Sequence, residues 1–285
     1  MKICAITGAN GWLGSRTVAA FERDGWQVRR LMRTPASAAD RRFMLGDEVP
    51  AETLAGCDAL VHCAYDFAPL KWRELEAVNV HGTQRLLAAA HTAGVQRISV
   101  ISTMSAFTGC VSLYGRTKLA IEAAGRDAGA LLLRPGLIYG DQSGGMFGRL
   151  VAQVRGARFQ PLIGSGRQIL NLIHEQDLTD FIRRHAACEV ATPTHPLTAA
   201  HEQGWAFRAI LEAIAIALGR RIRFIPLQWR SIWLGLKCAE LVGLRLGFRS
   251  DSLLSLMNQD PHPDFSANAS SGLTCRPFDA ATLRL

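Results

Sequence analysis

The chain has 285 residues, of which 48% are hydrophobic and 20% are charged. These proportions are those of an ordinary globular protein, and the length suffices for one large domain or two small ones. The formal net charge of +8 comes from residues spread along the chain, without a basic tract interleaved with aromatic residues. We therefore expect no nucleic-acid partner, and we attribute the charge to a solvated surface that attracts anionic cofactors or substrates.

The seven cysteines are scattered and form no CxxC pair or cluster with histidine. This pattern predicts reduced thiols in a cytoplasmic protein, with no disulfide framework and no metal site. Charged residues interrupt the apolar stretch 231–247, whereas a membrane span requires about 20 apolar residues. We expect this stretch to be a core helix of a smaller C-terminal part rather than a membrane-surface or subunit-contact helix, and we expect no membrane partner.

The segment TGANGWLG at residues 7–14 lies between an apolar run over 2–6 and a helical pattern over 13–24. A strand, a glycine-rich turn and a helix can cradle a nucleotide diphosphate, because glycines allow close approach and the helix N-terminus offers free N–H groups. The spacing G-x-x-G-x-x-G is one residue wider at its first gap than the usual dinucleotide fingerprint. The residues predicted to bind the cofactor here are Gly8, Asn10, Gly11, Trp12, Leu13 and Gly14.

Apolar runs and helical patterns alternate through the first half of the chain. Further strands are predicted at 27–32, 59–63, 97–101 and 130–134, and helices at about 70–93 and 113–127. Gly25 and Gly94 are expected to end helices. The alternation predicts an α/β fold with a Rossmann-type, doubly wound parallel sheet that binds its ligands at the carboxyl ends of the strands.

We expect residues 1–140 to form the dinucleotide-binding domain, to which the chain returns at about 170–188. Residues 141–285 are expected to form a smaller, mixed α/β substrate-binding part. Its predicted helices lie near 146–156, 204–218 and 229–256.

Tyr114 and Lys118 lie four residues apart in the predicted helix 113–127, so they share one helix face. An ammonium beside a phenol favours the phenolate, so we expect Lys118 to lower the pKa of Tyr114 and to let it exchange a proton with a substrate oxygen. The Y-x-x-x-K pattern alone is weak. Here Ser102 and Thr103 follow the preceding strand and offer a hydroxyl to the same oxygen.

Cofactor choice depends on the end of the second strand, where an acidic residue would bind the adenosine ribose and favour NAD. This chain has Arg33 there and no acid. A guanidinium suits the oxygens of a 2′-phosphate, so we predict NADP over NAD. The alternative is that Arg33 stacks on adenine or faces solvent.

Taken together, these motifs resemble the short-chain dehydrogenase/reductase superfamily, of the extended or atypical type usually called the NAD-dependent epimerase/dehydratase family. The resemblance covers roughly residues 1–180, and its motifs occur in the family's order. They are TGANGWLG at 7–14, GD at 46–47, VHCA at 61–64, NVHGT at 79–83, IST at 101–103, Tyr114 to Lys118, RPGLIYG at 134–140 and NLIHEQDL at 171–178.

The resemblance assigns roles to individual residues. It implies that Tyr114 is the general acid/base, that Lys118 holds the nicotinamide ribose, and that Thr103 is the hydroxyl partner, with Ser102 as the alternative. It places Asp47 beside the adenine, Cys63 and Ala64 in the cofactor cleft, Pro135 at the nicotinamide, and Asn79 in a structural role. We expect His62 and His174 to be structural, and Trp12 to pack on the sheet edge or close over the cofactor.

The implied activity is hydride transfer on a hydroxyl or carbonyl carbon of a small molecule, foremost a nucleotide sugar, which is anionic. The segment between Thr103 and Tyr114 is shorter than in sugar-nucleotide epimerases, so an NADPH-dependent reductase of a small ketone or aldehyde is the alternative. A further alternative is a non-catalytic NAD(P)-binding sensor or assembly factor. Apolar residues on two helices allow a homodimer: Leu86, Leu87, Ala90, Leu119 and Ile121.

Overall fold

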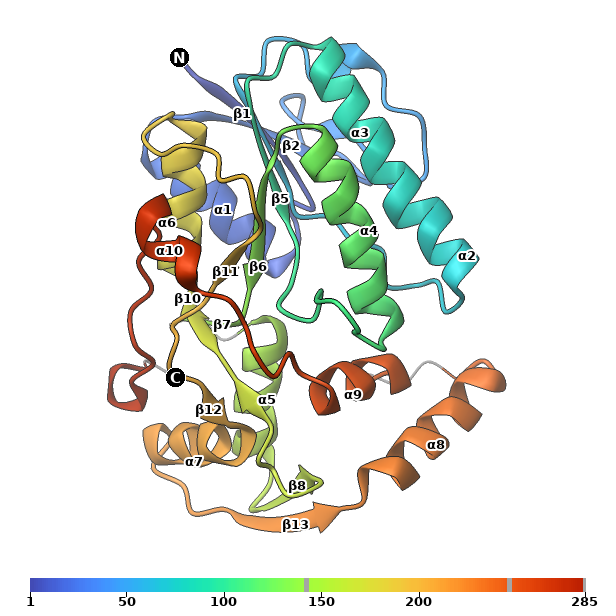
Figure 1. Ribbon diagram of the computed structural model, residues 1–285, viewed down its shortest axis with the longest axis vertical. Coiled ribbons are helices and arrows are strands. Elements are labelled where there is room, and N and C mark those ends of the chain that lie inside the picture. The colour runs from blue at the N-terminus through green and yellow to red at the C-terminus, as the bar shows by residue number, and fades with distance from the viewer. Residues whose placement is uncertain (141–143, 245–247, 284–285) are drawn as a thin grey trace.

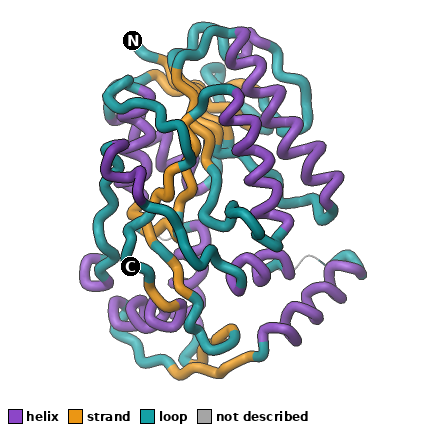
Figure 2. Tube along the Cα trace, in the orientation of Figure 1, coloured by secondary structure: helices purple, strands orange, loops and turns teal. Residues whose placement is uncertain are grey.

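Seven parallel strands form the central sheet of the computed structural model, which describes residues 1–140, 144–244 and 248–283. The strand order is β11-β6-β5-β4-β1-β2-β3. The sheet runs through the upper half of the molecule, with helices on both faces (Figures 1 and 2). The strands are β1 (Ile3–Thr7), β2 (Gln27–Met32), β3 (Arg41–Arg42), β4 (Ala59–His62), β5 (Arg97–Ile101), β6 (Leu131–Pro135) and β11 (Leu197–Ala199). The predicted fold class is confirmed, and each predicted strand is present to within one residue at either end. The edge strands β3 and β11 are too short to show a periodicity, so the sequence does not predict them.

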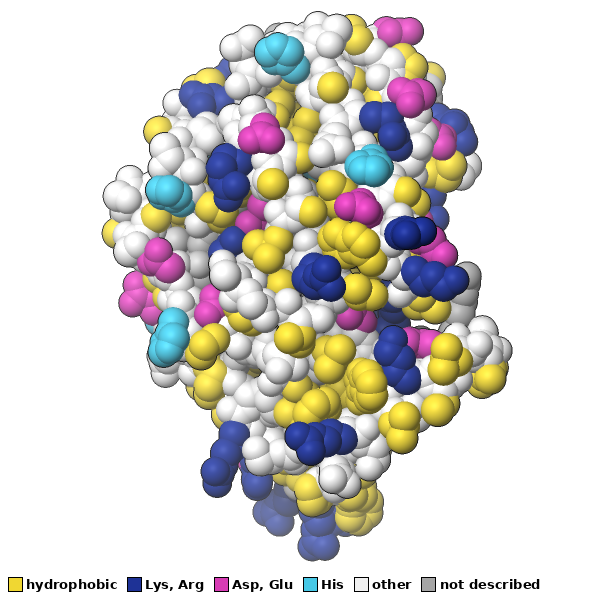
Figure 3. All heavy atoms as spheres, turned by 45° about the vertical axis from the view of Figure 1, so that its right-hand side comes forward, with side chains coloured by type: hydrophobic (Ala, Val, Ile, Leu, Met, Phe, Trp, Pro, Cys, Tyr) yellow, Lys and Arg dark blue, Asp and Glu magenta, His cyan; other side chains and the backbone are white. Residues whose placement is uncertain are grey.

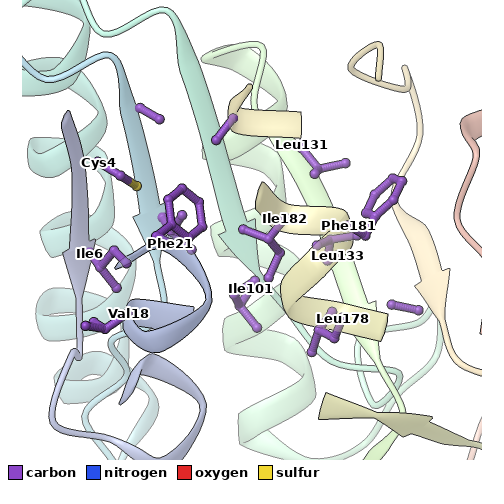
Figure 4. Packing of buried hydrophobic residues seen from close by; sticks show 14 of the residues in the cluster. Cys4, Ile6, Val18, Phe21, Ile101, Leu131, Leu133, Leu178, Phe181 and Ile182 are labelled. Atoms are coloured by element: carbon purple, nitrogen blue, oxygen red, sulfur yellow. The ribbon is translucent and has the colours of Figure 1, made fainter. Parts of the chain in front are cut away.

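Helices α1 (Trp12–Arg23) and α6 (Glu175–Ala186) cover one face of this sheet. Figure 4 shows their inward side chains meeting those of the central strands. The side chains that pack there are Val18 and Phe21 of α1, Leu178, Phe181 and Ile182 of α6, and Cys4, Ile6, Ile101, Leu131 and Leu133 of the strands. The helix from residues 175–186 therefore lies next to the first helix of the chain.

Helices α3 (His81–Thr92) and α4 (Leu113–Asp127) cover the opposite face. Most of the apolar residues that allow a dimer are buried here against the sheet of their own chain, namely Leu86, Leu87, Ala90 and Ile121. These four side chains are therefore core residues and do not form an outer apolar face. The homodimer stays a prediction that they no longer support.

The predicted helix 70–93 is interrupted. It consists of α2 (Trp72–Leu75), a π-helical turn at Glu76–Val80 and α3. Such turns frequently occur at functional sites, and this one contains Asn79. Gly25 and Gly94 follow α1 and α3 with φ of 78° and 74°, which confirms their predicted place at helix ends.

The second part of the chain has a core of its own beneath the carboxyl edge of the sheet. Its elements are α5 (Gly145–Gly156), α7 (Phe207–Ala217) and three strand pairs: β7 (Leu137–Tyr139) with β10 (Leu172–His174), β8 (Phe159–Ile163) with β13 (Arg223–Leu227), and β9 (Ile169–Leu170) with β12 (Trp205–Ala206). Tyr139, Phe147 and Ile210 are buried at its centre. The expected boundary at residue 141 falls in 141–143, outside the described residues.

The predicted helix 229–256 is wrong, because the chain forms two helices there, α8 (Trp229–Leu241) and α9 (Ser250–Met257). Gly243 ends α8 with a φ of 78°. Its N–H donates to the Glu240 carbonyl, and the N–H of Leu244 donates to the Ala239 carbonyl, which is the hydrogen-bond pattern of a glycine-terminated helix. Residues 245–247, the end of the apolar stretch, lie outside the described residues.

Helix α8 is also not a core helix, contrary to the prediction for 231–247. None of its thirteen residues, all of which the structure describes, is buried. Leu234 and Leu241 are 58% and 83% exposed, because α8 projects from the molecule and packs on α9 (Figure 1). Within the described ranges, no helix has both the length and the hydropathy that a membrane crossing requires.

The short helix α10 (Ser266–Ser271) packs next to β11, and Asn268 donates a hydrogen bond to the Thr198 carbonyl. Helix α10 thus lies against the edge of the central sheet. All seven cysteines are described, and all are free.

Candidate active site

The glycine turn after β1 packs closely on the start of α1 and on the end of β4. Gly8 has a φ of 65°, and the N–H of Gly11 donates to its carbonyl at 2.8 Å. A Cβ on Gly14 would lie 2.1 Å from the Gly8 oxygen, so α1 begins in direct contact with the turn. The first N–H groups of α1 therefore face the tip of the turn, where an anion is favoured. This geometry fits a cofactor diphosphate.

Thr7 ties the turn to the end of the neighbouring strand β4. Its hydroxyl oxygen accepts hydrogen bonds from the backbone N–H groups of Cys63 and Ala64, both at 3.1 Å. The same hydroxyl is 2.8 Å from His62 Nδ1. Cys63 and Ala64 are half-buried and lie beside Gly8. The walls of the expected cofactor cleft are thus held together by one side chain.

His62 extends this connection to the π-helical turn. Thr83 donates to the Asn79 carbonyl, so its oxygen accepts from His62 Nε2 at 2.9 Å, and Nδ1 is left to accept from Thr7. Burial and the charge of Lys118 lower the pKa of His62 to about 3. The imidazole is therefore neutral and serves as a structural link between Thr7 and Thr83.

The Asn79 side chain fixes the segment that follows β4. Its Oδ1 accepts from the Asp66 N–H at 2.7 Å, and its Nδ2 donates to the Asp66 carbonyl at 3.0 Å. This pair of hydrogen bonds places Tyr65 and Phe67 at the carboxyl edge of the sheet. Ser102 and Thr103, which follow β5, lie at the same edge.

Tyr114 and Thr103 meet at this edge, where both line one cleft and the Thr103 hydroxyl lies near the phenol of Tyr114. Burial raises the pKa of Tyr114 to about 12, and the nearby Thr103 hydroxyl only partly opposes that rise. The expectation that Lys118 lowers this pKa is wrong for this state of the protein. The Lys118 ammonium instead donates to the Ile101 carbonyl at 2.7 Å, and burial lowers the pKa of Lys118 to about 8.

Ser102, the alternative hydroxyl, points away from Tyr114. Its oxygen donates to Glu122 at 2.5 Å, and Glu122 accepts two hydrogen bonds from Arg134, at 2.8 and 2.6 Å. Ser102 is therefore part of a buried ion-pair cluster, and its hydroxyl is engaged by Glu122 and not by Tyr114. Thr103, one residue further along, lines the cleft together with Tyr114.

Two aromatic residues that the sequence did not single out surround Tyr114. The Tyr65 ring meets it edge-on at 5.1 Å, and the Phe67 ring stacks on it at 5.6 Å. The Lys118 ammonium lies 5.0 Å from the centre of the Tyr65 ring, at cation–π distance. Both aromatic residues directly follow β4, and their place at a strand's carboxyl end is the signal that could have found them.

Helix α9 holds the start of the helix that carries Tyr114. The Asp251 carboxylate accepts hydrogen bonds from the backbone N–H groups of Leu113 at 2.7 Å and Tyr114 at 2.9 Å. Ser255 donates to the Ser112 hydroxyl at 2.8 Å. An anion that binds the free N–H groups of a first helical turn stabilises the helix. No motif or spacing indicates this contact, because it joins residues more than a hundred positions apart.

A cleft of about 440 Å³ lies over these residues. Of the predicted site residues it brings together Trp12, Leu13, Thr103, Tyr114 and Pro135. Most of the remaining lining is apolar, including Phe67, Met104, Ile138, Met146, Leu170 and Leu256. The Trp12 ring closes one side of the cleft, because it lies against Gly144 and Gly145 at the start of α5.

Arg33 and Asp47 lie outside this lining. Arg33 is exposed directly after β2, at the carboxyl edge of the sheet. Asp47 is half-buried, and its carboxylate pairs with Arg42 at 3.1 Å. Asn10 and Gly11 are exposed at the tip of the glycine turn, while Gly14 is buried.

A parallel sheet with a glycine turn after its first strand, and with a phenol and an ammonium at its carboxyl edge, defines a nucleotide-binding α/β oxidoreductase. Comparison with known proteins agrees with this class. The chain belongs to the NAD dependent epimerase/dehydratase family, whose model matches residues 4–192. It is accordingly an NAD(P)-dependent enzyme of the short-chain dehydrogenase/reductase type.

Curated relatives include a ceramide reductase of Caulobacter vibrioides, 29% identical over 79% of this chain and 73% of the relative. Another is the 4-hydroxy-2-methyl-3-oxo-4-farnesyl-3,4-dihydroquinoline-1-oxide ketoreductase of Stigmatella aurantiaca, 29% identical over 59% of this chain and 60% of the relative. Among solved structures, MoeE5 in complex with UDP-glucuronic acid and NAD superposes with a TM-score of 0.74, at 21% identity, over 100% of this chain and 98% of that chain.

Proposed function

We propose that this protein transfers hydride between a nicotinamide cofactor and a carbon that bears a hydroxyl or carbonyl, with Tyr114 as general acid/base. One observation carries the proposal: Tyr114 and Thr103 together line the cleft at the carboxyl edge of the sheet. A substrate oxygen that approaches both groups would accept a hydrogen bond from each.

Bound nicotinamide supplies or accepts the hydride. Its diphosphate would be held by the turn from Gly8 to Gly14, and the remaining contacts would come from Cys63, Ala64, Pro135, Lys118 and, beside the adenine, Asp47. With a pKa of about 12, Tyr114 keeps its proton at neutral pH and can donate it to a carbonyl oxygen. Lys118, with a pKa of about 8, is then mainly cationic and would stabilise the phenolate that remains.

The position of Arg33 supports NADP as the preferred cofactor, since no acidic residue accompanies it at the end of β2. Replacing Arg33 by Ala should weaken NADPH binding about tenfold, as expected for one charge-assisted phosphate contact, and leave NADH binding unchanged. Calorimetric titration with both cofactors measures this, and exposed Arg23→Ala is the control. If Arg33→Ala weakened the binding of NADPH and NADH equally, the proposed preference for NADP would be contradicted.

Two substrate classes have support. A nucleotide sugar is supported by the net positive charge and by the similarity to MoeE5, whose solved complex contains UDP-glucuronic acid. A ketone or aldehyde is supported by the apolar lining of the cleft and by the two relatives named as reductases. Cofactor that stays bound through purification would favour an epimerase, and freely exchanging cofactor would favour a reductase.

The proposed role of Tyr114 is tested by two tyrosine-to-phenylalanine variants that share one aromatic cluster. Tyr114→Phe should lower kcat by about a hundredfold to ten-thousandfold on any substrate found with NADPH or NADH. Tyr65→Phe keeps the ring that faces Tyr114, so kcat should stay within about threefold of the wild type. Undiminished turnover by Tyr114→Phe would overturn the mechanism.

Two further expectations concern the protein in solution. The seven free thiols support a reducing compartment such as the cytoplasm. The homodimer stays a prediction without support from the buried side chains of α3 and α4, and light scattering in solution would test it.

A further inference from the structure

A second hollow of about 450 Å³ adjoins the cleft, between α8 and the segment after β4. We call it the α8 groove and define it by Phe67, Leu70, Leu236, Leu244, Phe248 and Arg249. Phe67 and Arg249 also line the cleft, so the two hollows share a wall. Figure 3 shows hydrophobic side chains gathered on the lower part of the corresponding face, where α8 projects.

The charged groups that border the groove bond to the protein itself, except that Arg249 Nε is buried without a hydrogen-bond partner. The Glu240 carboxylate accepts hydrogen bonds from the N–H and the hydroxyl of Ser250, and Lys237 lies 3.7 Å away. The terminal nitrogens of Arg249 donate to the carbonyls of Phe67 and Pro69. What the groove offers to a ligand is therefore chiefly apolar surface.

Much of that apolar surface is open to water. Phe67 is 57% exposed, Leu70 41% and Leu244 59%. Contiguous exposed apolar surface around a cavity of this size is typical of a ligand site. Residues 236, 240, 243 and 244 recur at helical spacing, so α8 and its end turn one face toward the groove. The apolar side chains on this face of α8 thus border the groove and are not buried in a core.

We propose that the substrate carries an extended hydrocarbon chain, which leaves the cleft past Phe67 and lies in the α8 groove while its carbonyl or hydroxyl carbon is at Tyr114. This inference rests on the proposed function and names its substrate class as a lipid-like ketone or alcohol. A diphosphate in the same place would need free cations. Among described residues, Arg249 is the one cationic side chain in the lining of either hollow, and it faces backbone carbonyls.

The inference predicts a dependence on chain length. Each methylene that enters the groove should raise kcat/KM about threefold to fourfold, until the chain passes the end of the groove. A series of straight-chain methyl ketones, from butanone through nonanone to tridecanone, tests this with NADPH.

Two leucines of α8 provide a matched pair of variants. Leu236 lines the groove, whereas Leu234, two residues earlier and 58% exposed, does not. Leu236→Ser should lower kcat/KM for tridecanone about tenfold and leave that for butanone unchanged. Leu234→Ser should change neither. Neither leucine is buried, so both variants should fold.

Binding separates this inference from the proposed function. Calorimetric titration of Tyr114→Phe protein with the same ketones should show affinity that rises with chain length and falls in the Leu236→Ser background. If no ketone is turned over but this pattern holds, the proposed function fails and the groove assignment stands. If ketones are turned over without dependence on chain length, or if the two leucine variants behave alike, the groove assignment is overturned. Absence of binding by every ketone overturns it as well.

Discussion

The glycine turn and the α8–α9 region reach the same cleft by different physical means. Around the turn, contacts join residues close in sequence or neighbouring parallel strands, as with Gly14 against Gly8. In the α8–α9 region, Asp251 bonds to Leu113 and Tyr114 across more than a hundred residues. The first region is thus specified by local geometry, whereas the second depends on how a late segment docks.

The largest expected difference between the two regions is the effect of replacing a glycine by alanine. Gly14→Ala places a Cβ 2.1 Å from the Gly8 oxygen, so the turn or α1 must move. We expect a loss of about 3 kcal/mol in the free energy of unfolding and a cofactor affinity reduced more than about tenfold. Urea denaturation and cofactor titration measure both.

The control lies in the second region. A Cβ on Gly235, in α8, would meet no neighbouring atom within 4 Å, so Gly235→Ala should stabilise the protein by about 0.5 to 1 kcal/mol. If Gly14→Ala and Gly235→Ala lost equal unfolding free energy, the glycine turn would not be more closely packed than α8.

The buried ammonium of Lys118 should make the free energy of unfolding depend on pH. Its pKa is lowered from 10.5 to about 8, so between these values the unfolded chain binds more protons than the native protein. The penalty for burying the charge is present below about pH 8 and is relieved as pH rises. The free energy of unfolding should therefore gain about 2 kcal/mol from this group between about pH 8 and about pH 10.

This gain should disappear in Lys118→Met and persist in Lys71→Met, since Lys71 is exposed. Denaturation curves at the two pH values, compared between variants, cancel the contributions of all other groups. An unchanged pH dependence in Lys118→Met would contradict the burial of a charge at this position.

The contact of Asp251 with the start of α4 links the two regions, and its removal has the smallest predicted effect on stability. Asp251→Asn removes the charge that binds the first N–H groups of α4 and turns one acceptor into a donor, which should cost about 1 to 2 kcal/mol of unfolding free energy. Because Tyr114 is on that first turn, kcat should also fall. Asp264→Asn is the control, since Asp264 binds the N–H of nearby Ser266. Indistinguishable variants would show that α9 does not position Tyr114.

The sequence predicted what short-range rules determine. The glycine turn, the central strands and the shared face of Tyr114 and Lys118 follow from periodicity and spacing. It did not predict that Ser102 turns to Glu122 while Thr103 turns to Tyr114, because adjacent hydroxyls at a strand end differ only in the direction that packing assigns them. Nor did it predict Asp251, whose role depends on a docking contact that no local pattern encodes.

The apolar pattern of α8 was misleading for a related reason. Apolar residues at helical spacing predict a helix, and they do not distinguish a face that packs on a core from one that borders a groove. Gly243, whose positive φ ends α8, was the local signal that two helices lie between residues 229 and 256.

A crystal structure of the protein with bound NADP tests the central claim most directly. We predict the diphosphate against the N–H groups that follow Gly11, the 2′-phosphate near Arg33, and the nicotinamide ring beside the hydroxyl of Tyr114. A nicotinamide bound elsewhere, or a Tyr114 hydroxyl directed away from the ring, would contradict it.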